Sequence, residues 1–177
     1  GLNITYSMNA SGSQYGIYND GDHDNVTIQN CEFMDGNSSS TADLAIFWDD
    51  TFGSHNASFI NNTITTLSED SVAISIVGAN DSLMESNNIL TNGSNARCID
   101  LDSGNRNIAR KNRCEAQNVL GSTYGIQLLG TEKYDIVDNN SINSTSACVR
   151  LTNTANRTII LNNDCHTINV LTIRDDT

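Results

Sequence analysis

The sequence has no proline, few aromatic residues and little positive charge. Among its 177 residues, aromatic side chains make up 6%, and nine Lys and Arg residues stand against 21 Asp and Glu residues, which gives a net charge of −12. This charge repels nucleic-acid phosphates and anionic lipids, so neither is expected as a partner. No apolar run approaches the roughly 20 residues that span a bilayer, so membrane insertion is not expected either.

The sequence also lacks the close cysteine and histidine spacings of metal and redox sites. No CxxC pair occurs, and the three histidines are scattered, so we expect them at the surface. We expect the cysteines to be small buried apolar residues, with one disulfide left open as an alternative. The positions concerned are Cys31, Cys98, Cys114, Cys148 and Cys165, together with His23, His55 and His166.

An internal repeat runs along most of the chain. Each copy has a small residue, then Ile or Val, then a variable residue and usually an apolar one, and the Ile or Val positions lie 29, 28, 25, 27 and 23 residues apart. Such periods are typical of supersecondary units that stack into solenoids. The column consists of Ile17, Ile46, Ile74, Ile99, Ile126 and Val149.

A second segment, centred on asparagine, follows each copy of the first. An apolar pair precedes the Asn, and another apolar residue follows two places after it. Because Asn accepts left-handed backbone angles and its amide both donates and accepts hydrogen bonds, we expect an asparagine ladder at a corner of the coil. The ladder consists of Asn62, Asn87, Asn112, Asn140 and Asn163, with Cys31 taking the position in the first copy.

These patterns predict an all-β protein: a right-handed, single-stranded parallel β-helix of about six coils that covers residues 1–177 as one domain. Each coil should contain at least two short strands, and parallel connections are nearly always right-handed. Stacking would place the Ile and Val column inward at about 4.8 Å per coil. Because we find no capping helix at either end, we expect the chain to be part of a larger protein or assembly.

The segments NVTIQNCEF, ASFINNTIT, DIVDNNSIN and TIILNNDCH resemble the parallel β-helix repeats of the pectate-lyase-like superfamily. The resemblance covers about residues 16–169. It implies the architecture, but the superfamily includes lyases, hydrolases, epimerases, tailspikes and adhesins, so it does not give the activity. The polygalacturonase-like members would call for NxD, DD, GHG and RxK motifs in order, and this chain matches only the DD, at Asp49-Asp50.

The residue after each Ile or Val should face outward, which defines the face to examine for a site. Tyr18 and Phe47, on adjacent coils, would offer an aromatic platform for a sugar ring. The catalytic candidates are Asp49, Asp100, Asp102 and Arg150. Two coils separate Asp49 from Asp102, which predicts backbones about 9.6 Å apart, near the upper end of the carboxyl separations in inverting glycosidases. The alternative is that these residues merely cover a solvated sheet.

Two further features predict ligand or partner binding. Asp20, Asp22 and Asp24 could wrap a calcium ion, but Asn25 and Cys31 stand where an EF-hand loop needs Gly and Glu, so no cofactor other than possible calcium is expected. A basic cluster on one coil could bind an anionic saccharide or contact an acidic neighbouring chain. It consists of Arg97, Arg106, Arg110, Lys111 and Arg113.

Eleven N-x-S/T sequons occur, more than we expect by chance, and they predict glycosylation. Sequons in turns are better candidates than those of Asn61 and Asn139, which adjoin the inward Asn column. The preferred sites are Asn37, Asn56, Asn80, Asn92, Asn143 and Asn156.

Two function classes remain open. We rank an extracellular structural or adhesive module of a cell-surface or virion protein, glycosylated and self-assembling into filaments through its open ends, above a polysaccharide-active lyase, hydrolase or epimerase. Regular coils, excess sequons and the absence of a complete catalytic motif favour the module. We expect an extracellular or cell-surface location, and as partner either carbohydrate or further copies of the chain that associate through the open ends.

Overall fold

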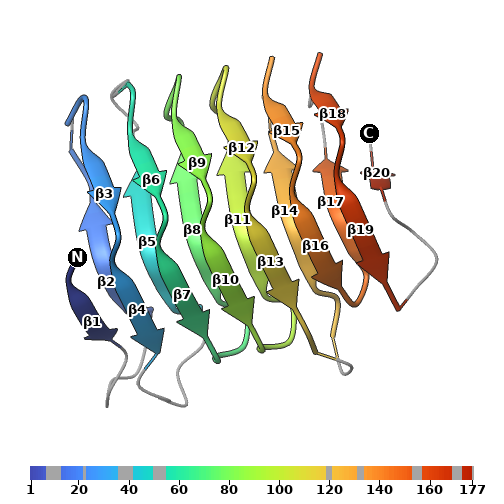
Figure 1. The fold of residues 1–177 in the computed structure, drawn as a ribbon, viewed down its shortest axis with the longest axis horizontal. Helices are drawn as coiled ribbons and strands as arrows, with labels where there is room; N and C mark the ends of the chain where they lie inside the picture. Colours follow the sequence, from blue (N-terminus) through green and yellow to red (C-terminus); the bar gives the residue numbers. More distant parts are fainter. Residues whose placement is uncertain are drawn as a thin grey trace.

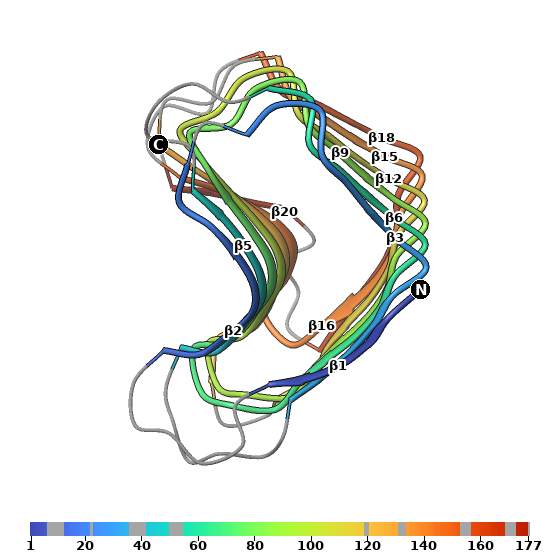
Figure 2. The same ribbon diagram turned by 90° about the vertical axis from the view of Figure 1, so that its left-hand side faces the viewer.

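A computed structural model describes residues 1–6, 13–21, 23–35, 42–49, 55–118, 121–130, 134–152, 157–168 and 173–176. Within these ranges the chain forms six successive coils of three strands each and two strands of a seventh, stacked in sequence order along one axis (Figure 1). Seen from the N-terminal end, the chain runs clockwise as it recedes, so the solenoid is right-handed (Figure 2). The predicted right-handed parallel β-helix is confirmed, and all its sheets are parallel.

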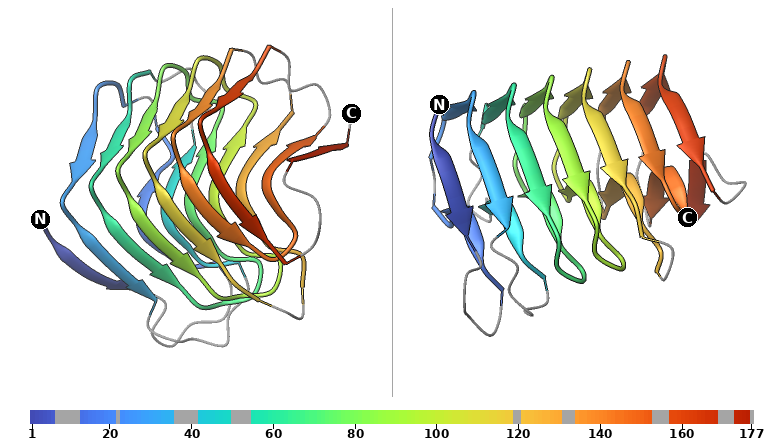
Figure 3. Two further views of the ribbon diagram at one scale, coloured as in Figure 1. Left: turned by 45° about the vertical axis from the view of Figure 1, so that its right-hand side comes forward. Right: turned by 60° about the horizontal axis from the view of Figure 1, so that its bottom comes forward.

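Three sheets, here called A, B and C, line the three sides of the solenoid (Figure 3). Sheet A contains β1 (Asn3–Tyr6), β4 (Glu32–Asp35), β7 (Thr63–Thr66), β10 (Asn88–Thr91), β13 (Arg113–Ala116), β16 (Ser141–Ser144) and β19 (Asp164–Thr167). Sheet B contains β2 (Tyr15–Asn19), β5 (Leu44–Asp49), β8 (Val72–Val77), β11 (Arg97–Asp102), β14 (Tyr124–Leu129), β17 (Ala147–Thr152) and β20 (Ile173–Asp176). Sheet C contains β3 (Thr27–Gln29), β6 (Ser58–Ile60), β9 (Leu83–Glu85), β12 (Ile108–Arg110), β15 (Ile136–Asp138) and β18 (Ile159–Leu161).

The predicted inward column of Ile and Val residues is confirmed. Each member pairs in register with the next along sheet B, and every member except Ile17 is fully buried. A second inward column two residues later contains Trp48, Ile76, Leu101 and Leu128. These columns pack in the core against large side chains of the other two sheets, such as Phe33 of sheet A and Phe59 of sheet C.

The asparagine ladder lies at the corner between sheets C and A and is confirmed. Each side-chain amide donates to the Oδ1 atom of the next Asn along the axis, with N–O distances of 3.1, 3.0, 3.0 and 2.9 Å from Asn62 to Asn163. The residue before each ladder position has a positive φ, which turns the chain sharply at this corner. These corner residues are Asn30, Asn61, Ser86, Lys111, Asn139 and Asn162.

The corner explains why each coil has three strands where the sequence predicts at least two. The segment that contains Asn112 is split by the turn at Lys111 into β12 and β13, which belong to different sheets. Cys31 occupies the ladder position of the first coil, where its backbone N–H donates to Asn62 Oδ1 at 3.0 Å.

The strands of sheet B bend inward, so their outer side is concave (Figure 2). The bend occurs at the small residue of each repeat. Cys98 is fully buried and is disulfide-bonded to Cys114 of sheet A, and the next residue, Ile99, is also fully buried. Two successive residues therefore face the core, and the residues on either side of them, Arg97 and Asp100, both lie on the outer face, where they form an ion pair at 3.5 Å.

No helix with the length and apolar character needed to cross a membrane occurs in the described ranges.

Candidate functional site

The outer side of sheet B, here called the sheet B face, gathers aromatic, acidic and basic side chains in rows that follow the axis. Its members come from the residue two places before each inward Ile or Val and from the residue after it. They are Tyr15, Tyr18, Phe47, Arg97, Asp100, Tyr124, Gln127 and Arg150.

The N-terminal end of the sheet B face carries three packed aromatic rings. Tyr18 and Phe47 are neighbours in register, and their rings stack with centroids 5.5 Å apart and planes 8° from parallel. The ring of Tyr15 lies 4.7 Å from that of Tyr18 and 5.4 Å from that of Phe47. Because the side chain of Tyr18 is 50% exposed, the cluster presents open ring surface to solvent.

Asp100 is the centre of the polar part of the sheet B face. Only 8% of the residue is exposed, and burial, reinforced by the charge of Asp102, raises the pKa of its carboxyl group to about 6. The guanidinium groups of Arg97 and Arg150 oppose the rise, but burial outweighs them. A carboxyl group with this pKa exchanges protons near neutral pH, as a general acid or base must.

Several polar atoms near Asp100 are buried without a hydrogen-bond partner among the described residues. They are Oδ1 of Asp100, Nε of Arg97 and Oε1 of Gln127, which is itself only 2% exposed and follows Asp100 in register. Arg150 comes next in the same row, with its guanidinium carbon 4.7 Å from the centre of the Tyr124 ring. Buried polar groups normally have partners, so a carboxylate oxygen and a guanidinium nitrogen buried without one among the described residues make Asp100 and Arg97 an unusual pair.

The predicted pair Asp49 and Asp102 lies farther along the strands. Both residues pair in register with Val77, which confirms that they belong to one column and are two coils apart. The carboxylate of Asp102 accepts a hydrogen bond of 2.7 Å from the hydroxyl group of Ser103. Asp50, the second residue of the DD pair, lies outside the described residues.

The calcium hypothesis finds no support in the described residues. Asp22 lies outside them, Asp20 is exposed, and the carboxylate of Asp24 accepts a hydrogen bond of 2.6 Å from the backbone N–H of His55. No group of three acidic, histidine or cysteine side chains placed to hold a metal occurs in the part of the chain that the structure describes. All three histidines are exposed, as predicted.

The basic cluster predicted on one coil is not a single surface, which corrects the sequence interpretation. Only Arg97 reaches the sheet B face. Arg106 forms two hydrogen bonds of 2.6 Å to Asp81, Arg110 and Lys111 both bind Glu85, and Arg113 pairs with Glu115. Arg110 and Lys111 share one partner, but the other three side chains lie in different strands or at another corner, so closeness in sequence does not bring all five charges together.

The predicted glycosylation sites differ in exposure. Asn56, Asn92 and Asn143 are exposed, whereas Asn37 and Asn156 lie outside the described residues. Asn80 is partly exposed, and its Oδ1 atom accepts a hydrogen bond of 2.9 Å from Asn105. The argument against Asn61 and Asn139 is wrong: both are exposed, because the positive-φ corner residue points outward when the ladder residue after it points inward.

Sequence reasoning did not place Tyr15, Arg97 and Tyr124 on the sheet B face. Strict alternation assigns them to the core side, because the residue two places before an inward Ile should also face inward. The available signal was the small residue that follows each of them, since a small side chain marks a close approach of two sheets. A Cβ atom on Gly125 would lie 2.2 Å from Ile142 of sheet A.

Comparison of the chain with protein-family models, with curated proteins and with solved structures gives no match.

Proposed function

We propose that this protein is a surface-exposed adhesive module that binds a saccharide chain along the sheet B face. The observation that carries the proposal is the layout of this face: three packed aromatic rings at one end, and the partly exposed side chains of Arg97 and Arg150 in the same sheet two or more coils farther on. Aromatic rings stack on the apolar faces of sugars, and fixed polar groups orient their hydroxyl groups. A linear chain parallel to the axis would contact both parts.

An extracellular or cell-surface location is part of the proposal. The Cys98–Cys114 disulfide supports it, because disulfides persist mainly in oxidising compartments. The sequons at the exposed residues Asn56, Asn92 and Asn143 support it as well. Self-association through the open ends of the solenoid stays a prediction.

The alternative function is that of a polysaccharide lyase, hydrolase or epimerase of the pectate-lyase-like superfamily. Asp100 favours it, because its raised pKa suits proton transfer and two arginines lie close enough to influence it. In this alternative Asp100 would be the proton-transferring group, Arg97 and Arg150 would bind acidic or developing negative charge, and Asp49 and Asp102 would be accessory carboxylates.

The binding proposal predicts that Tyr18→Ala weakens saccharide binding at least tenfold, which corresponds to about 1.4 kcal/mol. The substitution removes the most exposed ring of the cluster. The measurement is binding of the purified protein to immobilised neutral and acidic oligosaccharides, followed by dissociation constants for those that bind. Tyr134→Ala is the matched control, because Tyr134 is 48% exposed, close to the value for Tyr18, but lies at a corner outside the sheet B face.

Equal loss in the two variants, or no binding by the unmodified protein, would count against the adhesive module. Incubation of each bound saccharide with the unmodified protein then separates the two functions. Unchanged saccharide supports the module, whereas new chain ends or a changed sugar configuration that disappear with Asp100→Asn support the enzyme.

The location predicts that the protein from its native source carries N-linked glycans on these 177 residues, whose bare mass is 19.2 kDa. Intact-mass spectrometry before and after enzymatic removal of N-glycans should give a heterogeneous excess that collapses, with deamidation at Asn56, Asn92 or Asn143. A native mass equal to that of the bare chain would contradict glycosylation and would leave the disulfide as the remaining support for export.

A further inference from the structure

We propose that Cys148 and Cys165 form a second disulfide, equivalent to Cys98–Cys114 and two coils farther along the solenoid. In the structure both are free thiols, and Cys148 is buried while Cys165 is partly exposed. The bond would join β17 of sheet B to β19 of sheet A.

The register of the two sheets makes the pairs equivalent. In sheet B, the pairs of flanking residues align Cys98 with Gly125 and Gly125 with Cys148. In sheet A, Cys114 pairs with Ile142, and Ile142 pairs with Cys165. Each cysteine of the second pair is therefore displaced from its counterpart by two coils along the same column.

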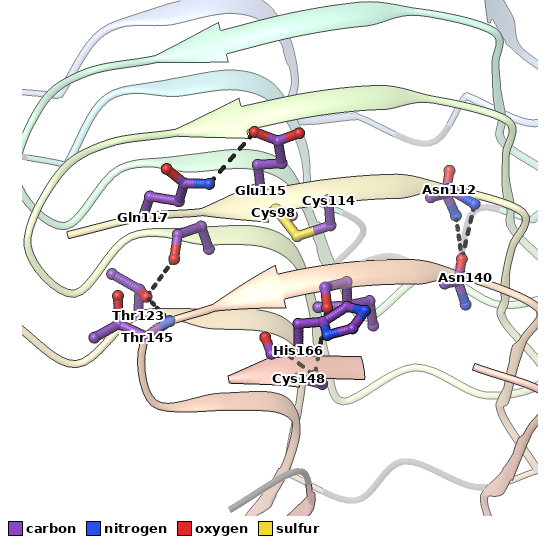
Figure 4. Close-up of a disulfide and its surroundings, with 12 residues drawn as sticks. Cys98, Asn112, Cys114, Glu115, Gln117, Thr123, Asn140, Thr145, Cys148 and His166 are labelled. Atoms are coloured by element: carbon purple, nitrogen blue, oxygen red, sulfur yellow. Dashed lines mark hydrogen bonds between the residues drawn. A yellow bond between two sulfur atoms is a disulfide. The ribbon is translucent and has the colours of Figure 1, made fainter. Parts of the chain in front are cut away.

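The columns that hold these cysteines lie against each other at several points along the solenoid. Where sheet B has Gly16, a Cβ atom would lie 3.0 Å from Phe33 of sheet A, and where it has Gly125, a Cβ atom would lie 2.2 Å from Ile142. In these two columns, a small residue of sheet B therefore packs closely against a side chain of sheet A from the next coil. In the Cys98–Cys114 pair the same approach gives a Cα–Cα separation of 6.0 Å, which is typical of disulfides (Figure 4).

The two thiols lie close to each other. Each influences the pKa of the other, and Cys148 Sγ contacts the carbonyl oxygens of Ile142 and of His166, the residue after Cys165, at 3.7 and 4.0 Å. Burial raises the pKa of both thiols, so both are protonated at neutral pH. Joining them removes two electrons, so the reaction needs an external oxidant such as a disulfide.

Cys165 is the point of entry, because it is the more accessible thiol. Its thiolate attacks a donor disulfide, such as oxidised glutathione or that of a thiol–disulfide oxidoreductase, and releases one donor thiol. The Cys148 thiolate then attacks the mixed disulfide at Cys165 and releases the second. In total two S–H bonds are lost, one S–S bond forms, and two electrons and two protons pass to the donor.

Peptide mapping tests the proposal directly. The protein is incubated folded with oxidised glutathione, its free thiols are alkylated, and it is digested with trypsin without reduction. Cleavage after Lys133, Arg150, Arg157 and Arg174 yields Tyr134–Arg150 and Thr158–Arg174, and these two peptides should be found linked, lighter by two hydrogen atoms than their sum. The count of free thiols should fall from three to one, leaving only Cys31.

The Cys98–Cys114 bond is the internal control, since it links Cys98–Arg106 to Cys114–Lys133 in the same digest. The variant Cys165→Ser should keep that link and lose the new one, with Cys148 alkylated after unfolding. The proposal is overturned if Cys148 and Cys165 are both alkylated after the glutathione treatment, or if either is linked to Cys31.

Discussion

Replacing Asn87 with alanine is expected to lower the free energy of unfolding by about 4 kcal/mol, the largest loss we predict for a single side chain here. Its amide donates to the carbonyl oxygen of Phe59 at 2.9 Å and to Asn112 Oδ1 at 3.0 Å. Its Oδ1 atom accepts from both the backbone N–H and the side-chain amide of Asn62, at 3.0 and 3.1 Å. Alanine would leave several of these buried groups without partners, each at a cost of about 1–3 kcal/mol.

Asn88→Ala is the matched control for this prediction. Asn88 is the next residue and is exposed, so its loss should change stability by no more than about 0.5 kcal/mol. The measurement is urea unfolding of both variants, monitored by the circular dichroism signal of the β-sheets. Equal midpoints for the two variants would show that the ladder does not stabilise the solenoid.

The ladder and the core were predictable because both repeat. Six copies of one pattern fix which residue faces inward more firmly than any single strand could, and a buried polar column stands out when it consists of one residue type. What the sequence did not indicate is that the corner residue next to the ladder is fully outside, as Asn61 and Asn139 show. That result depends on the positive φ at the corner, which period-2 reasoning does not include.

The candidate site was predictable only in part, because its residues do not repeat. The outward column from Tyr18 to Arg150 follows from simple alternation and agrees with the register. Arg97, by contrast, reaches this face only because the strand bends at Cys98. A bend set by close packing of sheets A and B is a tertiary feature, and the small residue at the bend is its local signal in the sequence.

The charge distribution adds one constraint on a ligand. All nine Lys and Arg residues lie at or after Arg97, so the three aromatic rings occupy a part of the chain that has only acidic charge. An anionic group of a bound saccharide would be repelled there and attracted to Arg97 and Arg150. The proposal therefore favours a chain whose neutral sugars stack near Tyr18 and whose acidic groups, where present, lie two or more coils farther on.

Replacing Asp100 with asparagine is expected to stabilise the protein at pH 8 by about 2–3 kcal/mol and to have little effect below pH 4. Burial raises the pKa of this carboxyl group from 3.8 to about 6, so the folded state binds its proton more tightly than the unfolded state does. Stability therefore falls as the pH rises from about 4 to about 6 and stays lower above that range. Asparagine has nearly the same shape and carries no charge to bury at any pH.

The test is urea unfolding of the unmodified protein and of Asp100→Asn at both pH values, with the difference between the two proteins taken at each pH. Asp81→Asn is the control with the opposite sign, because the hydrogen bond from Arg106 lowers the pKa of Asp81, so its ionised form supports the fold. That variant should be less stable than the unmodified protein at pH 8, and the difference in stability between the two should disappear at low pH.

If Asp100→Asn were destabilising at pH 8, the ion pair with Arg97 would outweigh burial, and Asp100 would be a structural residue. If it is stabilising, the chain retains a buried carboxylate that costs stability at neutral pH, which is expected where the group is needed for binding or catalysis.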